Sequence, residues 1–169
     1  IGSIIKGLIV LRGKIVSEPP AKDAQLGVLV TLLSKAKNTA FGKHYKFDEI
    51  LKADDIQAAF ASNLPYFDYN KINEQWWSKM HEGETNVTWP GDPPYFALSS
   101  GTTGKSSKKI PVTEDMIEAI RTTGIKQVGA LSNFDLPSDF FEKEIMMLGS
   151  STDLKEEGDH EEGEISGIS

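Results

Sequence analysis

The sequence contains no cysteine, and this absence excludes two kinds of site at once. A chain without thiols can build neither a disulfide framework nor a metal site with thiolate ligands. Nothing in the composition therefore requires an oxidising compartment. We expect a cytoplasmic protein.

The chain also lacks a long uninterrupted apolar run. The most apolar segment, residues 1–16, is broken by Lys6, Arg12 and Lys14, and no small-residue cleavage site follows it. Neither a signal peptide nor a membrane span fits this pattern. Its apolar residues recur at helical spacing, which predicts an amphipathic helix that docks on a core; binding to a membrane surface is the less favoured use. We therefore expect no membrane partner.

An excess of positive charge is missing as well. The net charge is −7, and residues 153–164 alone carry seven Asp or Glu and one Lys, which leaves −1 for the remainder. Without a broad basic face, nucleic acid is not an expected partner. The acidic run includes His160, but His44 and His81 lie far from it in the sequence. Because no second histidine stands at ligand spacing, we interpret the run as a solvated acidic loop and predict no metal site.

What remains is ordinary globular material, with 169 residues and 38% hydrophobic residues, enough for one core. Residues 1–83 are predicted to be mainly helical, and residues 84–151 to form a strand, a loop, a helix capped by Thr113 and a strand at 144–150. Residues 152–169 are predicted to be an acidic loop and a truncated end. The predicted fold class is α/β. Beyond residue 20, the helical patterns lie at residues 21–40, 54–64 and 70–83.

The most informative segment is Ser99–Thr113, "SSGTTGKSSKKIPVT", which follows the first predicted strand. Glycines permit close approach of the backbone, hydroxyl groups donate hydrogen bonds and lysines supply charge, which together suit phosphate oxygens. A flexible polar surface loop is the plainer interpretation. The P-loop pattern matches only in its second half, at Gly104-Lys105-Ser106, because Ser99 stands where that motif requires glycine.

The segment resembles the first phosphate-binding signature of the adenylate-forming enzymes. Within that superfamily, the chain is most similar to the Gretchen Hagen (auxin-responsive promoter) family of acyl-acid amido synthetases. Members of that family share further motifs that appear here between Phe41 and Thr113. These are Phe41-Gly42, the P-x-x-x-Y segment Pro65–Tyr69, a helix that ends at Gly83, and Ile110-Pro111.

The resemblance implies a two-step reaction. A carboxylic acid reacts with ATP, assisted by Mg²⁺, to give an acyl-adenylate and pyrophosphate, and an amino acid then displaces AMP to form an amide. The resemblance implies that Lys108 is the catalytic lysine. Many superfamily members place this lysine at the position of Ser107, so Lys105 and Lys109 remain alternatives. The implied ATP-binding residues are Ser99, Ser100, Gly101, Thr102, Thr103, Gly104 and Lys105.

The superfamily's signatures for adenine, ribose and magnesium lie farther along the chain in its members and are not found in this sequence. We therefore expect an incomplete N-terminal portion of the large domain of such an enzyme, inactive alone. Two alternatives stay open. One is a P-loop-like nucleotide phosphohydrolase or kinase, and the other is a non-catalytic anion-binding or interaction module.

Overall fold

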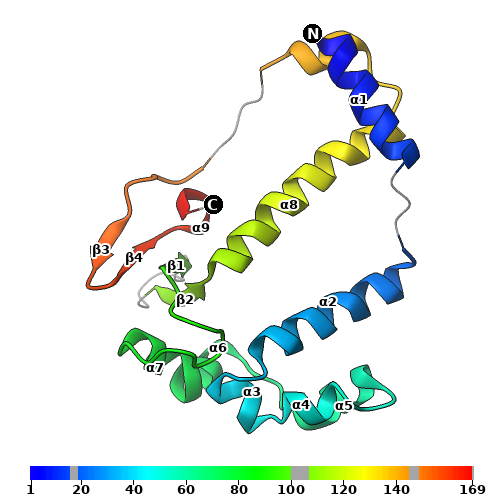
Figure 1. Cartoon of the computed structure of the whole chain (residues 1–169). Helices are drawn as coiled ribbons and strands as arrows, with labels where there is room; N and C mark the ends of the chain where they lie inside the picture. Colours follow the sequence, from blue (N-terminus) through cyan, green and yellow to red (C-terminus); the bar gives the residue numbers. More distant parts are fainter. Residues whose placement is uncertain (16–18, 100–106, 145–148, 169) are drawn as a thin grey trace.

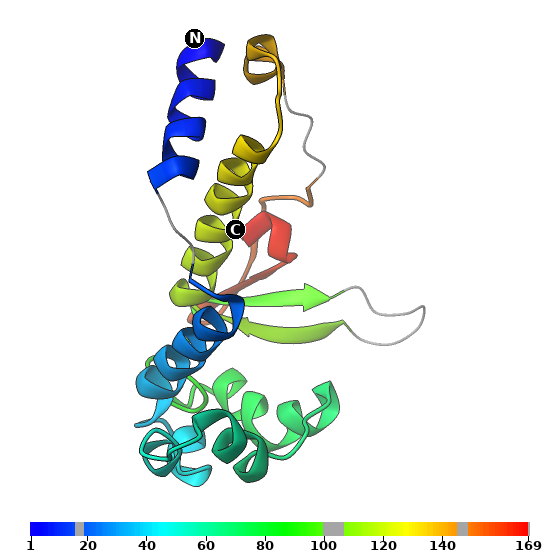
Figure 2. The ribbon, with the colours of Figure 1, turned by 90° about the vertical axis from the view of Figure 1, so that its right-hand side faces the viewer.

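A small mixed sheet lies between a layer of short helices and one long helix (Figures 1 and 2). The computed structural model of the chain describes residues 1–15, 19–99, 107–144 and 149–168. The predicted α/β class is confirmed. The helices are α1 (Gly2–Ile15), α2 (Ala21–Ala36), α3 (Ala40–His44), α4 (Phe47–Ile50), α5 (Ile56–Asn63), α6 (Tyr69–Ile72), the π-helical turn η1 (Asn73–Trp77), α7 (Ser78–His81), α8 (Glu114–Ala130), the 3₁₀ turns η2 (Leu131–Asn133) and η3 (Ser138–Glu142), and α9 (Ile165–Ile168).

The sheet has four strands in the order β2-β1-β4-β3. They are β1 (Tyr95–Ser99), β2 (Lys108–Val112), β3 (Lys155–Glu157) and β4 (His160–Gly163). Strands β1 and β2 are antiparallel, β1 and β4 are parallel, and β3 and β4 are antiparallel. Strand β4, which comes from near the end of the described chain, therefore lies beside β1 in the middle of the sheet.

The two faces of the sheet belong to different cores, because successive side chains of a strand point to opposite faces. Phe96 of β1 is 1% exposed and packs with Trp76 and Met80 in the layer of short helices. Its neighbour Ala97 packs on the other face with Ile117 of α8. The sheet thus packs against the layer of short helices on one face and against α8 on the other.

A sharp connection between α2 and α3 explains the Phe41-Gly42 motif. Thr39 caps α3: its hydroxyl accepts a hydrogen bond from the Gly42 N–H at 3.0 Å and donates one to the Ala36 carbonyl at 2.7 Å. A Cβ on Gly42 would collide with that carbonyl oxygen, so only glycine fits here. The turn carries Phe41 into the aromatic core, with its ring centroid 5.0 Å from that of Trp76.

Helix α1 is formed as predicted and lies beside η3, η2 and the end of α8, but among its residues Gly2 alone is buried, so the predicted docking on a core is not seen in the described residues. The N–H of Gly2 donates to Glu142 Oε1 at 2.7 Å, which satisfies a free donor at the helix start. Part of the apolar stripe still faces outward, including Ile4 and Leu8. None of the described helices is both long enough and apolar enough to cross a membrane.

Two local predictions are wrong. The segment between the first predicted strand and Thr113 was predicted as a loop, but its last residues before Thr113 form the strand β2. Pro111 fits within β2 because β2 is an edge strand, where a missing N–H is tolerated. The acidic run, predicted as a loop, forms β3 and β4 instead. Strand β4 pairs with β1, and two glutamates of the run form ion pairs with lysines, Glu162 with Lys109 and Glu157 with Lys155.

The strand predicted at 144–150 cannot be compared in full, since residues 145–148 lie outside the described ranges. Residues 41–47, which lie between the predicted helical patterns 21–40 and 54–64, contain most of α3 and the start of α4. The Thr113 cap is confirmed: its side chain accepts a hydrogen bond from the Met116 N–H at 3.2 Å.

Candidate functional site

The first candidate site is the end of the β1–β2 hairpin that points away from α8 and the short helices (Figure 2). The antiparallel register places Ser99, the last residue of β1, directly opposite Lys108, the first residue of β2. The hairpin therefore brings the two ends of the predicted phosphate-binding segment together. The other predicted residues, Ser100, Gly101, Thr102, Thr103, Gly104 and Lys105, lie outside the described ranges.

Tyr69 holds the start of β2 in place. Its hydroxyl oxygen accepts a hydrogen bond from the Lys109 N–H at 3.0 Å. The ammonium group of Lys108 lies 5.0 Å from the centroid of the same ring, which is cation–π distance. Tyr69 is the first residue of α6, and Asp68 caps this helix by accepting from the Lys71 N–H at 2.8 Å. The P-x-x-x-Y segment thus supports the strand on which the predicted lysine lies.

The two neighbouring lysines of β2 have different electrostatic partners. Lys109 forms an ion pair with Glu162 of β4, whose side chain is only 5% exposed. Lys108 is exposed, and among the residues that the structure describes it has no carboxylate within ion-pair distance. Of these two, Lys108 is the one whose charge is available to a ligand.

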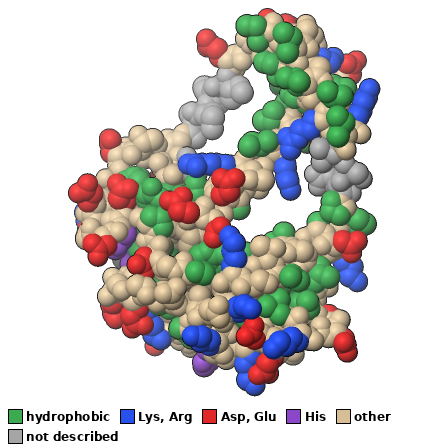
Figure 3. Space-filling model, in the orientation of Figure 1, with side chains coloured by type: hydrophobic (Ala, Val, Ile, Leu, Met, Phe, Trp, Pro, Cys, Tyr) green, Lys and Arg blue, Asp and Glu red, His purple; other side chains and the backbone are tan. Residues whose placement is uncertain are grey.

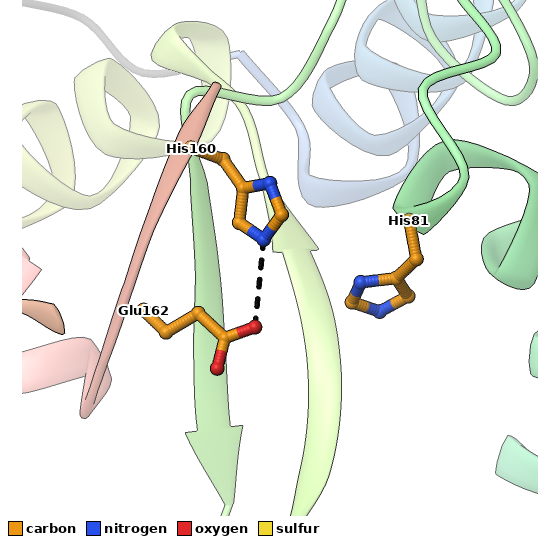
Figure 4. Close-up of side chains that lie close together, drawn as sticks. All are labelled: His81, His160 and Glu162. Atoms are coloured by element: carbon orange, nitrogen blue, oxygen red, sulfur yellow. Dashed lines mark hydrogen bonds and ion pairs between the residues drawn. The ribbon is translucent and has the colours of Figure 1, made fainter. Parts of the chain in front are cut away.

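A second cluster lies on the face of the sheet that contacts α7 (Figure 4). His160 Nε2 lies 3.4 Å from Glu162 Oε1, and both residues belong to β4. His81, the last residue of α7, stacks on Phe96 with the ring centroids 3.9 Å apart. One ligand atom from each of His81, His160 and Glu162 lies within 4.8 Å of the others.

The electrostatics of this cluster act on His81. Burial lowers the pKa of its imidazole, and the positive charge of Lys109 and the proximity of His160 lower it further, while Glu162 opposes them. The cluster could not be recognised from the sequence, because its two histidines come from distant segments. Only the parallel pairing of β4 with β1 brings them to one face, and no local spacing in the sequence indicates that pairing.

The acidic character predicted for the end of the chain is visible on the surface. Asp and Glu side chains gather on the side of the molecule where β3 and β4 lie (Figure 3). Glu162 is the exception, because its side chain is only 5% exposed and is paired with Lys109. The run therefore contributes both a solvated face and one buried charge.

Comparison with known proteins agrees with the motifs found above. The model of the GH3 family N-terminal domain matches residues 18–168, which is all of the chain except residues 1–17, which include α1, and the final residue. No curated protein and no solved structure gives a match. The chain therefore belongs to the GH3 family, the Gretchen Hagen 3 auxin-responsive acyl-acid amido synthetases.

Proposed function

We propose that this chain supplies the phosphate-binding part of an ATP-dependent acyl-acid amido synthetase. The observation that carries the proposal is the hairpin register, which sets the Ser99 hydroxyl and the exposed Lys108 at the two ends of one glycine-rich, hydroxyl-rich segment. Family membership supplies the reaction class, namely adenylation of an acid followed by amide formation. Lys108 acts as the catalytic lysine.

The first step divides the charge of ATP between two products. A carboxylate oxygen bonds to the α-phosphorus, the bond from that phosphorus to the bridging oxygen breaks, and pyrophosphate leaves with the electron pair. The ammonium of Lys108 stabilises the charge that gathers on the leaving β- and γ-phosphates. The hydroxyl of Ser99, with Ser100, Gly101, Thr102, Thr103, Gly104 and Lys105, completes the binding of these phosphates.

In the second step the amine of an amino acid attacks the acyl carbon and AMP departs, which forms an amide. The substrates are thus a small carboxylic acid and an amino acid, in keeping with the family. ATP enters with Mg²⁺ as its substrate complex. At the hairpin end, the described residues offer the hydroxyls of Ser99 and Ser107 and the ammonium group of Lys108, but no carboxylate, so we assign no Mg²⁺ ligand to this chain.

The proposal is tested by pyrophosphate exchange into ATP, measured on the complete reading frame that contains this domain with a panel of carboxylic acids. We expect acid-dependent exchange that Lys108→Ala strongly reduces. Lys22→Ala is the matched control, because Lys22 is an exposed lysine on α2, far along the chain from the hairpin. Exchange that is unaffected by Lys108→Ala would contradict the role of this lysine.

The products separate this function from its rivals. AMP and pyrophosphate are expected, whereas ADP and phosphate would indicate a nucleotide phosphohydrolase or kinase. A protein with no exchange, whose function survives replacement of Ser100, Gly101 and Lys108, would instead be a non-catalytic binding module.

A further inference from the structure

We propose that His81, His160 and Glu162 form a binding site for a transition-metal dication, with Zn²⁺ as the fitting ion. No metal site was predicted from the sequence, and the phosphate-binding role of the hairpin does not require one. The inference rests on the side-chain cluster on the α7 face of the sheet (Figure 4).

The three donors converge from two rigid elements. His160 and Glu162 are two residues apart on β4, so both point to the same face of the sheet. His81 comes from α7, which packs on this face of the sheet, and its stacking on Phe96 fixes the plane of its ring. The donor atoms lie within 4.8 Å of one another, and a tetrahedral Zn²⁺ with bonds of about 2.0–2.2 Å needs roughly 3.4 Å between them. Small side-chain rotations close that difference.

The ligand types select the metal. Two imidazoles and one carboxylate suit Zn²⁺ and neighbouring transition metals, whereas Mg²⁺ and Ca²⁺ prefer sites made of oxygen alone. Three protein ligands leave a fourth position for water, the arrangement of an open zinc site. The buried carboxylate of Glu162 also favours a cation at this point, since it is 5% exposed and needs a positive partner.

Lys109 is that partner in the structure, and it therefore competes with the metal. Its ammonium group pairs with the same carboxylate oxygen, Oε1 of Glu162, that lies near His160. The Lys109 side chain is 42% exposed and has a flexible stem, so it can turn toward water when a metal ion replaces it. The proposal thus predicts opposite effects for substitutions only a few ångströms apart.

The experiment measures Zn²⁺ binding to the full chain by equilibrium dialysis, and Co²⁺ binding by the visible absorption of a tetrahedral site. One ion should bind per chain. His81→Asn and His160→Asn should each weaken binding by at least about tenfold, because each removes a ligand. Lys109→Met should strengthen binding by about tenfold, because it removes the competing charge. His44→Asn is the matched control, since His44 packs against Tyr45 and Trp76 outside the cluster.

Two results would overturn the proposal. One is the absence of binding in both the natural chain and Lys109→Met. The other is equal binding in His81→Asn, His160→Asn and the natural chain, which would locate the ion on the acidic surface. Thermal unfolding adds an independent readout. Zn²⁺ should raise the unfolding temperature of the natural chain and of His44→Asn, and it should not raise that of the double variant lacking both ligand histidines.

Discussion

Two adjacent regions of one sheet hold positive charge in different ways. At the open end of the hairpin, Lys108 is exposed and lies over the ring of Tyr69. One residue farther along β2, Lys109 is paired with the buried Glu162 beside His160 and His81. The difference follows from the alternation of a strand, which sends neighbouring side chains to opposite faces. The difference shows that lysines adjacent in a sequence, such as Lys108 and Lys109, need not share one role.

Replacing each lysine separately tests most directly whether Lys108 and Lys109 have different roles. Lys108→Ala should reduce pyrophosphate exchange by about a hundredfold, because it removes one group that stabilises the leaving phosphates. Its free energy of unfolding should change by less than about 0.5 kcal/mol, as expected for an exposed side chain. Exchange kinetics and urea unfolding measure the two quantities on the same preparations.

Lys109→Ala provides the matched comparison for that experiment. It should lower the free energy of unfolding, since it leaves the buried carboxylate of Glu162 without its ion pair. If Lys109→Ala abolished exchange at unchanged stability while Lys108→Ala did not, the roles assigned to the two lysines would be reversed.

The second prediction concerns the carboxylate itself. Glu162→Gln should cost about 2 kcal/mol of unfolding free energy, because the side chain at position 162, only 5% exposed, loses its ion pair with Lys109. Urea unfolding monitored by circular dichroism gives the value. Glu156→Gln on β3 is the control, since Glu156 is exposed and should change stability little. Equal effects of both substitutions would show that the buried pair contributes nothing particular.

Much of the hairpin end could be predicted from the sequence. The strand Tyr95–Ser99, the cap at Thr113 and the helix that follows depend on local patterns, and the structure has all three. Gly83 also has the positive φ of 85° that a glycine at a helix end favours. These features are set by residues within one or two turns of each other, so a local pattern contains the information.

The cluster around Glu162 could not be predicted, because its cause is not local. Glutamates have low strand propensity, and a run of them indicates a loop when considered alone. The run becomes a strand only because β1 offers a parallel partner and Lys109 offers a compensating charge. Likewise, β2 contains Pro111, which is tolerated only at the sheet edge. Both facts depend on strand order, which the sequence pattern does not specify.

A third prediction concerns Tyr69, which contacts both lysines at the hairpin end. Tyr69→Phe keeps the ring beneath Lys108 but removes the acceptor for the Lys109 N–H, a hydrogen bond of about 1 kcal/mol. ATP affinity should fall several-fold, because β2 then holds Lys108 less firmly. Titration calorimetry with ATP measures this. Tyr66→Phe is the control, since Tyr66 is 89% exposed. Unchanged affinity in Tyr69→Phe would mean that the tyrosine supports the fold and not the hairpin end.

The smallest expected effect comes from an ion pair of the same chemistry outside the sheet. Asp115, in the first turn of α8, pairs with Lys35 of α2 and accepts a hydrogen bond from Trp89 Nε1 at 3.0 Å. The side chains of Lys35 and Asp115 are 48% and 47% exposed, so solvent screens the pair. Asp115→Asn should therefore cost only about 0.5 kcal/mol, well below the loss expected for Glu162→Gln.

The pH dependence identifies that contribution. Lys35 and then Trp89 hold the pKa of Asp115 below its ordinary value of 3.8. The stabilisation is thus fully present above that value and is lost as the pH falls through the lowered pKa of the folded state. Urea unfolding at pH 6 and near pH 3 should show a smaller acid loss in Asp115→Asn than in the natural chain. Glu114→Gln shares the helix turn but has neither partner, so an equal change in that variant would assign the effect to the helix dipole rather than to the ion pair.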